Sequence, residues 1–330
     1  MTVKIGIIGA GGIARSHIRA LASTDEARVV GVYDISEEAA AEAAAEAGEG
    51  AETFATTDAL LDRNKIDAVM ICVPQFARGD LEETAVARGI HLFVEKPLGL
   101  EMAEVRRKAA RIEASGLINA TGYCLRYYDT VEQARQYLEG KRVHLIQAHR
   151  FGTSHPSAWW LQLDRSGGHL VDAVTHQVDM IRYLAGEPIE VSARFGRAAL
   201  DRIRPETTIP DAGALTFSMA SGGVGSITES CVSSYHGGSE IKLFGADFFV
   251  QIVNNRTVTI IDDQQQVTRT SKVNEMDAQV LAFVRAVRTG KQELVRSNYA
   301  EGARTLAFTL AANRAAREGR AVTVAEEAER

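Results

Sequence analysis

The stretch from Ser166 to Asp179 combines residue types that can take a proton from a substrate. Asp172 and His176 are four residues apart, which places both on one face of a helix. Histidine titrates near neutral pH and is the side chain most often used as a general base. A solvated helix face carrying a local Asp–His hydrogen bond has the same spacing, so this pair alone leaves both interpretations open.

A second candidate, Lys96, follows the predicted strand at residues 91–94. The carboxyl ends of strands in doubly wound sheets are where ligands bind, and an ammonium group there stabilises charge that develops on an oxygen. An ordinary charged pair at the start of a loop explains Glu95–Lys96–Pro97 at least as well. The chemistry proposed for these side chains requires no metal.

A glycine-rich turn of the pattern G-x-G-x-x-A occupies residues 9–14, between a predicted strand at 3–8 and a predicted helix at 13–23. Its glycines permit a tight turn and a close approach of backbone to pyrophosphate, which then meets free amides at the helix N-terminus. Asp34 ends the next predicted strand, 29–33, where an acidic residue binds the ribose of a dinucleotide. A packing turn and a helix-capping acid are the alternatives, but they account for less of the combined pattern.

The predicted cofactor is NAD rather than NADP. The Asp34 carboxylate repels a 2′-phosphate, and the following Ile35 and Ser36 supply no cation. The predicted cofactor contacts come from the glycine turn and from the ends of later strands. They are Gly9, Gly11, Gly12, Ile13, Ala14, Asp34, Pro74, Glu95 and Lys96.

The elements that must position these residues fall into two groups. The first third of the chain alternates β-branched runs with helical stretches, which predicts a parallel, doubly wound sheet. Beyond about residue 122, strands with period-two alternation predict an antiparallel sheet. They are expected at 143–151, 191–197, 214–219, 224–232, 240–244 and 258–261, with helices at 130–140, 168–185, 276–288 and 299–318. We therefore predict an α/β protein with two domains, residues 1–122 and 123–330.

Composition excludes several classes of partner. Lys and Arg total 37 against 43 Asp and Glu, so the net charge of −6 favours neither nucleic acid nor an anionic membrane. The densest apolar run, residues 68–73, is far shorter than a membrane span. Three scattered cysteines indicate neither a disulfide framework nor a zinc site. With no export signal visible at the start, we expect a cytoplasmic protein that acts on a small molecule.

Together these motifs resemble the Gfo/Idh/MocA oxidoreductases, the family of glucose-fructose oxidoreductase and inositol dehydrogenase. The matching order is Gly9-x-Gly11-x-x-Ala14, Asp34, Glu95-Lys96-Pro97, Gly122-Tyr123-x-x-Arg126 and Asp172-x-x-x-His176-x-x-Asp179. The resemblance covers nearly the whole chain. It implies a Rossmann domain followed by an α/β domain with a large, mainly antiparallel open sheet.

By this resemblance Lys96, Asp172 and His176 are the catalytic residues. The implied reaction is oxidation of a secondary alcohol of a sugar, sugar derivative or cyclitol, or the reverse reduction, with His176 as general base. Expected substrate contacts are Arg126, His155, Trp160, Asp172, His176 and Tyr235, although core aromatics and solvated loop residues give similar patterns. The chain departs from the family at Arg78, Asp129 and Ser166, which we expect to be peripheral to the chemistry. A non-catalytic NAD-dependent sensor or regulator and an NAD-dependent glycosidase are the alternatives.

One face of the second predicted sheet is lined with small or hydroxyl side chains. Thr216 and its alternating neighbours oppose the apolar Leu215 and Phe217, and Thr228 lies among serines in the next strand. Such a face is either solvated or stacked against a second copy of the chain. The resemblance favours stacking, and implies a homodimer or homotetramer.

Overall fold

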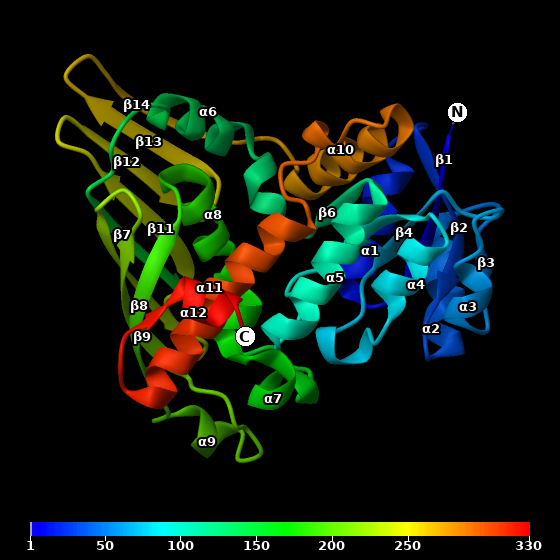
Figure 1. The fold of residues 1–330 in the computed structure, drawn as a ribbon, viewed down its shortest axis with the longest axis horizontal. Coiled ribbons are helices and arrows are strands. Elements are labelled where there is room, and N and C mark those ends of the chain that lie inside the picture. Colours follow the sequence, from blue (N-terminus) through cyan, green and yellow to red (C-terminus); the bar gives the residue numbers. More distant parts are fainter. Residues whose placement is uncertain (1) are drawn as a thin grey trace. The chain divides into compact units, whose positions relative to one another are not determined.

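The computed structural model describes residues 2–330, which divide into two compact units (Figure 1). Unit 1 comprises the chain up to Leu98 together with Glu104–Tyr127 and Asn274–Ala303. Unit 2 comprises Gly99–Ala103, Tyr128–Val273 and Arg304–Arg330. The predicted boundary at residue 122 omits the return of the chain to unit 1 at Asn274–Ala303.

Unit 1 contains a parallel sheet of six described strands in the order β3-β2-β1-β4-β5-β6. The strands are β1 Val3–Ile8, β2 Ala27–Tyr33, β3 Glu52–Thr53, β4 Ala68–Ile71, β5 His91–Val94 and β6 Asn119–Thr121. The connecting helices are α1 Gly12–Ala22, α2 Glu37–Ala47, α3 Thr57–Leu60, α4 Leu81–Ala87 and α5 Met102–Ser115. The strand order reverses beside β1, and ligands bind doubly wound sheets at that point. The predicted Rossmann fold is confirmed.

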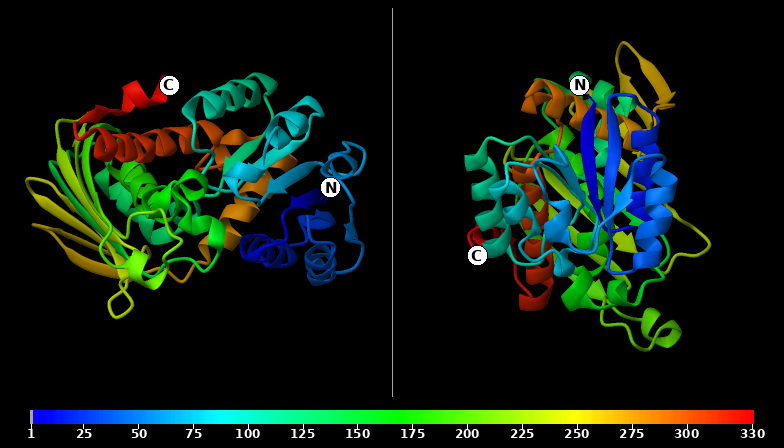
Figure 2. Two further views of the ribbon diagram at one scale, coloured as in Figure 1. Left: turned by 90° about the horizontal axis from the view of Figure 1, so that it is seen from below. Right: turned by 90° about the vertical axis from the view of Figure 1, so that its right-hand side faces the viewer.

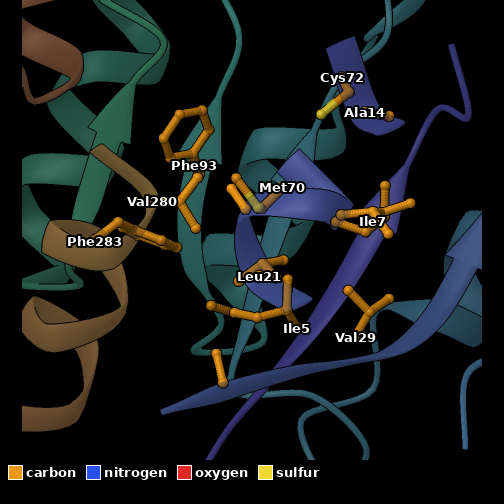
Figure 3. Close-up of a cluster of buried hydrophobic side chains, with 14 of the residues drawn as sticks. Ile5, Ile7, Ala14, Leu21, Val29, Met70, Cys72, Phe93, Val280 and Phe283 are labelled. Carbon is orange, nitrogen blue, oxygen red and sulfur yellow. The ribbon is translucent and has the colours of Figure 1, made fainter. Parts of the chain in front are cut away.

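The returning helix α10 (Glu275–Thr289) completes the core of unit 1. Its Val280 and Phe283 join the buried cluster formed by side chains of β1, β2, β4, β5 and α1 (Figure 3). The rings of Phe93 and Phe283 meet edge to face at 5.6 Å, an arrangement that aromatic pairs prefer. The apolar face of α10 therefore binds this segment to the first domain despite its distance in sequence.

Unit 2 is built on nine described strands in the order β14-β13-β12-β11-β7-β10-β9-β8-β15. All pairs are antiparallel except β7 with β10. The strands are β7 Leu145–Phe151, β8 Pro188–Gly196, β9 Ala212–Met219, β10 Val224–Ser230, β11 Gly238–Phe244, β12 Phe248–Val253, β13 Thr257–Asp262, β14 Gln266–Thr270 and β15 Val322–Thr323. The predicted large, mainly antiparallel sheet is confirmed, although β12, β14 and β15 were not predicted.

Helices α6 (Asp129–Leu138), α8 (Thr175–Ala185) and α11 (Tyr299–Glu318) lie against one face of this sheet (Figure 2). Phe217 of β9 packs edge to face on Phe308 of α11 at 5.5 Å. The opposite face carries Thr216 and Thr228, both exposed, as the alternation predicts.

Two further findings concern the whole described chain. Within residues 2–330, no helix combines the length and apolar character that crossing a membrane requires. The three cysteines are free thiols, and burial raises the pKa of each. Raised pKa values disfavour the reactive thiolate, so these cysteines behave as core residues.

Candidate active-site residues in the two units

The turn between β1 and α1 is shaped by backbone rather than by side chains. Gly9 has φ +95°, and a Cβ there would lie 2.9 Å from the Val73 side chain. At Gly11 and Gly12, by contrast, no neighbouring atom of the described residues lies within 4 Å of a built Cβ. Gly11 caps α1 without a side-chain hydrogen bond from any described residue. Open backbone and uncapped helix amides fit the pyrophosphate of a dinucleotide.

Asp34 lies beside this turn, as predicted, and also holds it. Its Oδ2 accepts a hydrogen bond from the Ala10 N–H at 2.7 Å, and its Oδ1 accepts one from the Ser36 N–H at 2.9 Å. The sequence indicated a ribose ligand, with a helix-capping acid as the alternative. The structure shows that the same carboxylate links β2 to the glycine turn.

Lys96 follows β5 on a segment braced by a buried hydrogen bond between Glu95 and His17. Glu95 is 5% exposed, and its Oε1 lies 2.7 Å from Nε2 of the fully buried His17 on α1. The other carboxylate oxygen of Glu95 accepts the Lys96 N–H at 3.2 Å. A Cβ at Gly122 would lie 2.4 Å from that oxygen, so only glycine leaves room for the carboxylate. The contact between Glu95 and the cofactor stays a prediction, whereas its structural role is visible.

Arg78, one of the three departures from the family pattern, contacts the backbone on both sides of Lys96. This guanidinium is buried and donates to the carbonyl oxygens of Glu95 at 2.6 Å and Pro97 at 2.8 Å, on either side of Lys96. It also donates to the carbonyl of Val73 at 3.1 Å. Arginine presents several donors in a rigid fork, so one side chain can fix the backbone at both neighbours of Lys96. Pro74, a predicted cofactor contact, lies next to Val73 and begins the 3₁₀ turn Gln75–Ala77 that leads to Arg78.

In unit 2, the segment carrying Asp172 and His176 is nearly covered. From residue 170 to residue 182, every side chain is buried except those of Asp172, Ala173 and His176. Asp172 and His176 are thus the two titratable side chains of this segment that are not buried. The predicted placement of Asp172 and His176 on one face agrees with this exposure. The prediction of a regular α-helix from residue 168 is wrong.

The first turn, Leu170–Val174, is a π-helix, and the α-helix begins only at Thr175. Single π turns within helices are rare and often occur at functional sites. Asp172 lies in this turn, and His176 lies just beyond it. Spacing alone does not reveal such a turn, because the same residues fit a regular α-helix.

Trp160 lies directly against Asp172. Its Nε1–H donates to Oδ2 of Asp172 at 2.8 Å, and the indole is only 2% exposed. The ring centroids of His155 and Trp160 lie 6.4 Å apart, with an interplanar angle of 40°. The His155 side chain is exposed. Contact between Trp160 and the substrate stays a prediction, while its hydrogen bond to Asp172 belongs to the structure.

The remaining two predicted substrate contacts lie in different surroundings. Tyr235 is fully exposed in the loop between β10 and β11 of unit 2. Arg126, in unit 1, is buried and donates to the Arg296 carbonyl at 2.7 Å and to the Glu301 carboxylate at 3.2 Å. Those bonds favour a structural role for Arg126, and its contact with substrate stays a prediction.

Sequence reasoning missed three charged or titratable residues near Asp172. Arg150 of β7 and Glu229 of β10 are neighbours in the parallel register, and Glu229 is bonded to the buried His169. Burial lowers the pKa of Arg150, and the charge of Asp172 opposes that shift. A signal was available, because Arg150 and Glu229 interrupt the apolar faces of their strands.

The folded units define an oxidoreductase with a Rossmann domain and an α/β domain, and comparisons with known proteins agree. Residues 3–123 match the family model "Oxidoreductase family, NAD-binding Rossmann fold", and residues 133–248 match "GFO/IDH/MocA C-terminal domain". The chain therefore belongs to the Gfo/Idh/MocA family. It is a dehydrogenase that acts on CH–OH groups, and its cofactor is a nicotinamide dinucleotide.

Two curated relatives extend over almost the whole chain. It is 30% identical to an inositol 2-dehydrogenase of Rhizobium meliloti (strain 1021), over 98% of this chain and 100% of that protein. It is 24% identical to a myo-inositol 2-dehydrogenase of Thermotoga maritima, over 98% and 99% of the two chains. Among solved structures, a levoglucosan dehydrogenase in complex with NADH shares the fold, with a TM-score of 0.86, 19% identity and coverage of 98% and 99%.

Proposed function

We propose that this protein is an NAD-dependent dehydrogenase that oxidises a secondary alcohol of a sugar, sugar derivative or cyclitol, or catalyses the reverse reduction. The observation that carries the proposal is the exposure pattern of residues 170–182. A segment that buries its other polar side chains but leaves an aspartate and a histidine accessible is suited to proton transfer.

The proposed roles follow from the charges that the reaction develops. When bound, the nicotinamide accepts the hydride from the carbinol carbon. His176 removes the hydroxyl proton as general base. The Lys96 ammonium stabilises the developing alkoxide, and Asp172 accepts a hydrogen bond from a substrate hydroxyl or orients His176.

A polyhydroxylated ring is the proposed substrate. Two relatives that span nearly the whole chain bear names of inositol dehydrogenases, which act on cyclitols. Asp172, His155 and Tyr235 carry the donors and acceptors that ring hydroxyls require. Trp160 and Arg126 complete the proposed set of substrate contacts.

NAD is the proposed cofactor, because Asp34 stands beside the glycine turn. Its carboxylate lies within hydrogen-bonding distance of a turn amide, so a 2′-phosphate near it would meet a fixed negative charge. Ile35 is exposed and offers no charge to offset that repulsion.

A test of the reaction is to incubate the purified protein with NAD and a panel of cyclitols, sugars and sugar derivatives, and to follow NADH by its absorbance. We expect net NADH formation with at least one member. A protein that binds NAD but oxidises nothing would support a sensor. Hydrolysis of a glycoside without net NADH would support a glycosidase, and either result would overturn the proposal.

We further propose that two copies associate through the uncovered face of the unit 2 sheet. Thr216 pairs with Ser226, and Thr228 pairs with Ala214, which leaves a surface of small side chains. A two-fold contact requires only that such a patch complement itself. Light scattering at low micromolar concentration should give a dimer or tetramer.

The double variant Thr216→Arg, Thr228→Arg should dissociate that contact, because it places like charges on both stacked faces. Gln264→Arg adds an arginine at an exposed turn of the same unit and should leave the mass unchanged. A wild-type monomer would rule out association. An oligomer that survives the double variant would rule out this face.

A further inference from the structure

Trp160 is buried against a proposed catalytic residue, yet neither proton nor hydride transfer requires an indole. The Nε1–H is the only polar donor of this side chain, and it points at Oδ2 of Asp172 over 2.8 Å. A hydrogen bond to an ionised carboxylate is about twice as strong as one between neutral groups. With only 2% of the residue exposed, water competes little for this bond.

The Trp160 indole also contacts a second buried ring. The ring of His169 meets it edge to face, with centroids 6.1 Å apart and an interplanar angle of 69°. Nδ1 of His169 is bonded to the Glu229 carboxylate, and both residues are buried. A Cβ at Gly213 would lie 2.7 Å from Oε1 of Glu229, so the glycine leaves the space that this carboxylate occupies.

Three side chains thus follow one another from Asp172: Trp160, His169 and Glu229. The His169–Glu229 pair restricts the ring, and the ring directs its N–H at the carboxylate. Buried polar groups that are fully bonded make a site rigid, and small displacements of a catalytic group are costly. A misplacement of about 1 Å can lower a rate by about 10²-fold.

We propose that Trp160 is the positioning residue of Asp172, with its indole held by the buried His169–Glu229 pair. The inference rests on the proposed catalytic role of Asp172. It assigns the indole N–H of Trp160 to Asp172, a function separate from the proposed contact between Trp160 and the substrate.

The first test is Trp160→Phe, which keeps an aromatic ring and removes the N–H. We expect kcat to fall by about 10- to 100-fold, with a smaller change in KM for the alcohol and the Kd for NAD within about twofold. Tyr137→Phe is the matched control, because it removes an aromatic donor to a carboxylate of the same unit, Oη to Asp262 Oδ2 at 2.7 Å. That control should retain wild-type kcat. Thermal melting of both variants establishes that they are folded.

A double-mutant cycle separates positioning from a general loss of packing. If Trp160 acts through Asp172, adding Trp160→Phe to Asp172→Asn should reduce kcat by less than threefold beyond Asp172→Asn alone. A merely structural effect of the smaller ring would lower kcat by the same factor in both backgrounds. Full additivity would therefore overturn the proposal.

A spectroscopic readout is independent of turnover. The chain contains two tryptophans, Trp159 and Trp160, so ¹⁵N-labelled protein gives two indole signals, and Trp159→Phe identifies that of Trp160. Asp172→Asn should shift the indole signal of Trp160. The control variant Asp262→Asn should shift it less. An unmoved signal would contradict the bond.

The outcomes distinguish this inference from the function on which it rests. If Asp172→Asn is fully active, the proposed role of Asp172 fails. If Asp172→Asn is impaired but Trp160→Phe has wild-type kcat, only the positioning role fails.

Discussion

The candidate functional groups of the two units differ in kind, because unit 1 offers mainly backbone amides and unit 2 offers side chains. In unit 1, the turn at Gly9 and Gly11 offers backbone amides, and even Lys96 is placed by bonds to the carbonyls of its two neighbours. In unit 2, the accessible groups are the side chains of Asp172 and His176. A backbone site is fixed once the fold forms, whereas a side-chain site needs further groups to hold each functional atom.

This difference predicts how each half responds to substitution. Removing a side chain from the unit 2 site should abolish chemistry while leaving the cofactor half intact. In unit 1, substitutions at Glu95 and Asp34 should act through fold stability and cofactor choice, whereas Lys96 shares in the proposed chemistry.

The largest expected effect is that of His176→Ala. Loss of the general base should reduce turnover by about 10²- to 10⁴-fold, with the Kd for NAD nearly unchanged, because the removed group transfers a proton. Steady-state kinetics and NAD titration measure the two quantities. His144→Ala, which removes an exposed histidine of the same unit, should behave as wild type. Intact turnover in His176→Ala would show that another group is the base.

The next effect concerns the buried pair of unit 1. Glu95→Ala leaves His17 fully buried without the carboxylate that it contacts at 2.7 Å. Leaving a buried polar group without its hydrogen-bond partner typically lowers the free energy of unfolding by about 1–3 kcal/mol. Urea denaturation measures this loss, and Glu101→Ala, at an exposed position, is the control. Unchanged stability with weakened NAD binding would instead make Glu95 primarily a cofactor ligand.

Cofactor choice should change less steeply. Asp34→Arg replaces a carboxylate by a cation that can pair with a 2′-phosphate, and should shift the NAD-to-NADP preference by about 10- to 100-fold, the equivalent of one charged hydrogen bond at about 1.5–3 kcal/mol. Because Asp34 also accepts the Ala10 amide, Asp34→Asn serves as a control that keeps an acceptor oxygen. Titration of each variant with both cofactors gives the ratio. Tighter binding of NADP by the wild type would overturn the assignment.

The same contrast explains which features the sequence predicts. The glycine turn is recognisable because its function needs particular backbone geometry, and few residues other than glycine allow φ +95° at Gly9. The Rossmann sheet is likewise predictable from its buried β-branched strands. The return of α10 to unit 1 was missed, because Val280 and Phe283 would suit any core.

The surroundings of Asp172 were less predictable for a related reason. The π turn at Leu170–Val174 and the bond from Trp160 depend on tertiary contacts between segments, which single-segment patterns do not contain. Trp160 was expected at the site on the basis of its type, but its hydrogen bond to Asp172 was not expected. The sequence feature that came nearest to indicating this network is the presence of charged residues, Arg150 and Glu229, on buried strand faces.

The smallest expected effect tests whether a single side-chain bond matters away from the site. The hydrogen bond from Tyr137 is the largest of the causes that lower the pKa of Asp262 to about 2. A depressed carboxyl pKa contributes stability that is present above its unfolded value, near 3.8, and is lost as pH falls toward the folded pKa. Tyr137→Phe should therefore lower the melting temperature slightly at pH 5–7, and the gap to wild type should narrow below about pH 4. Thermal melts across this range measure the gap, and in an Asp262→Asn background it should be small at every pH. A gap as wide at pH 3 as at pH 7 would mean that Tyr137 stabilises unit 2 through packing of its ring rather than through the carboxylate.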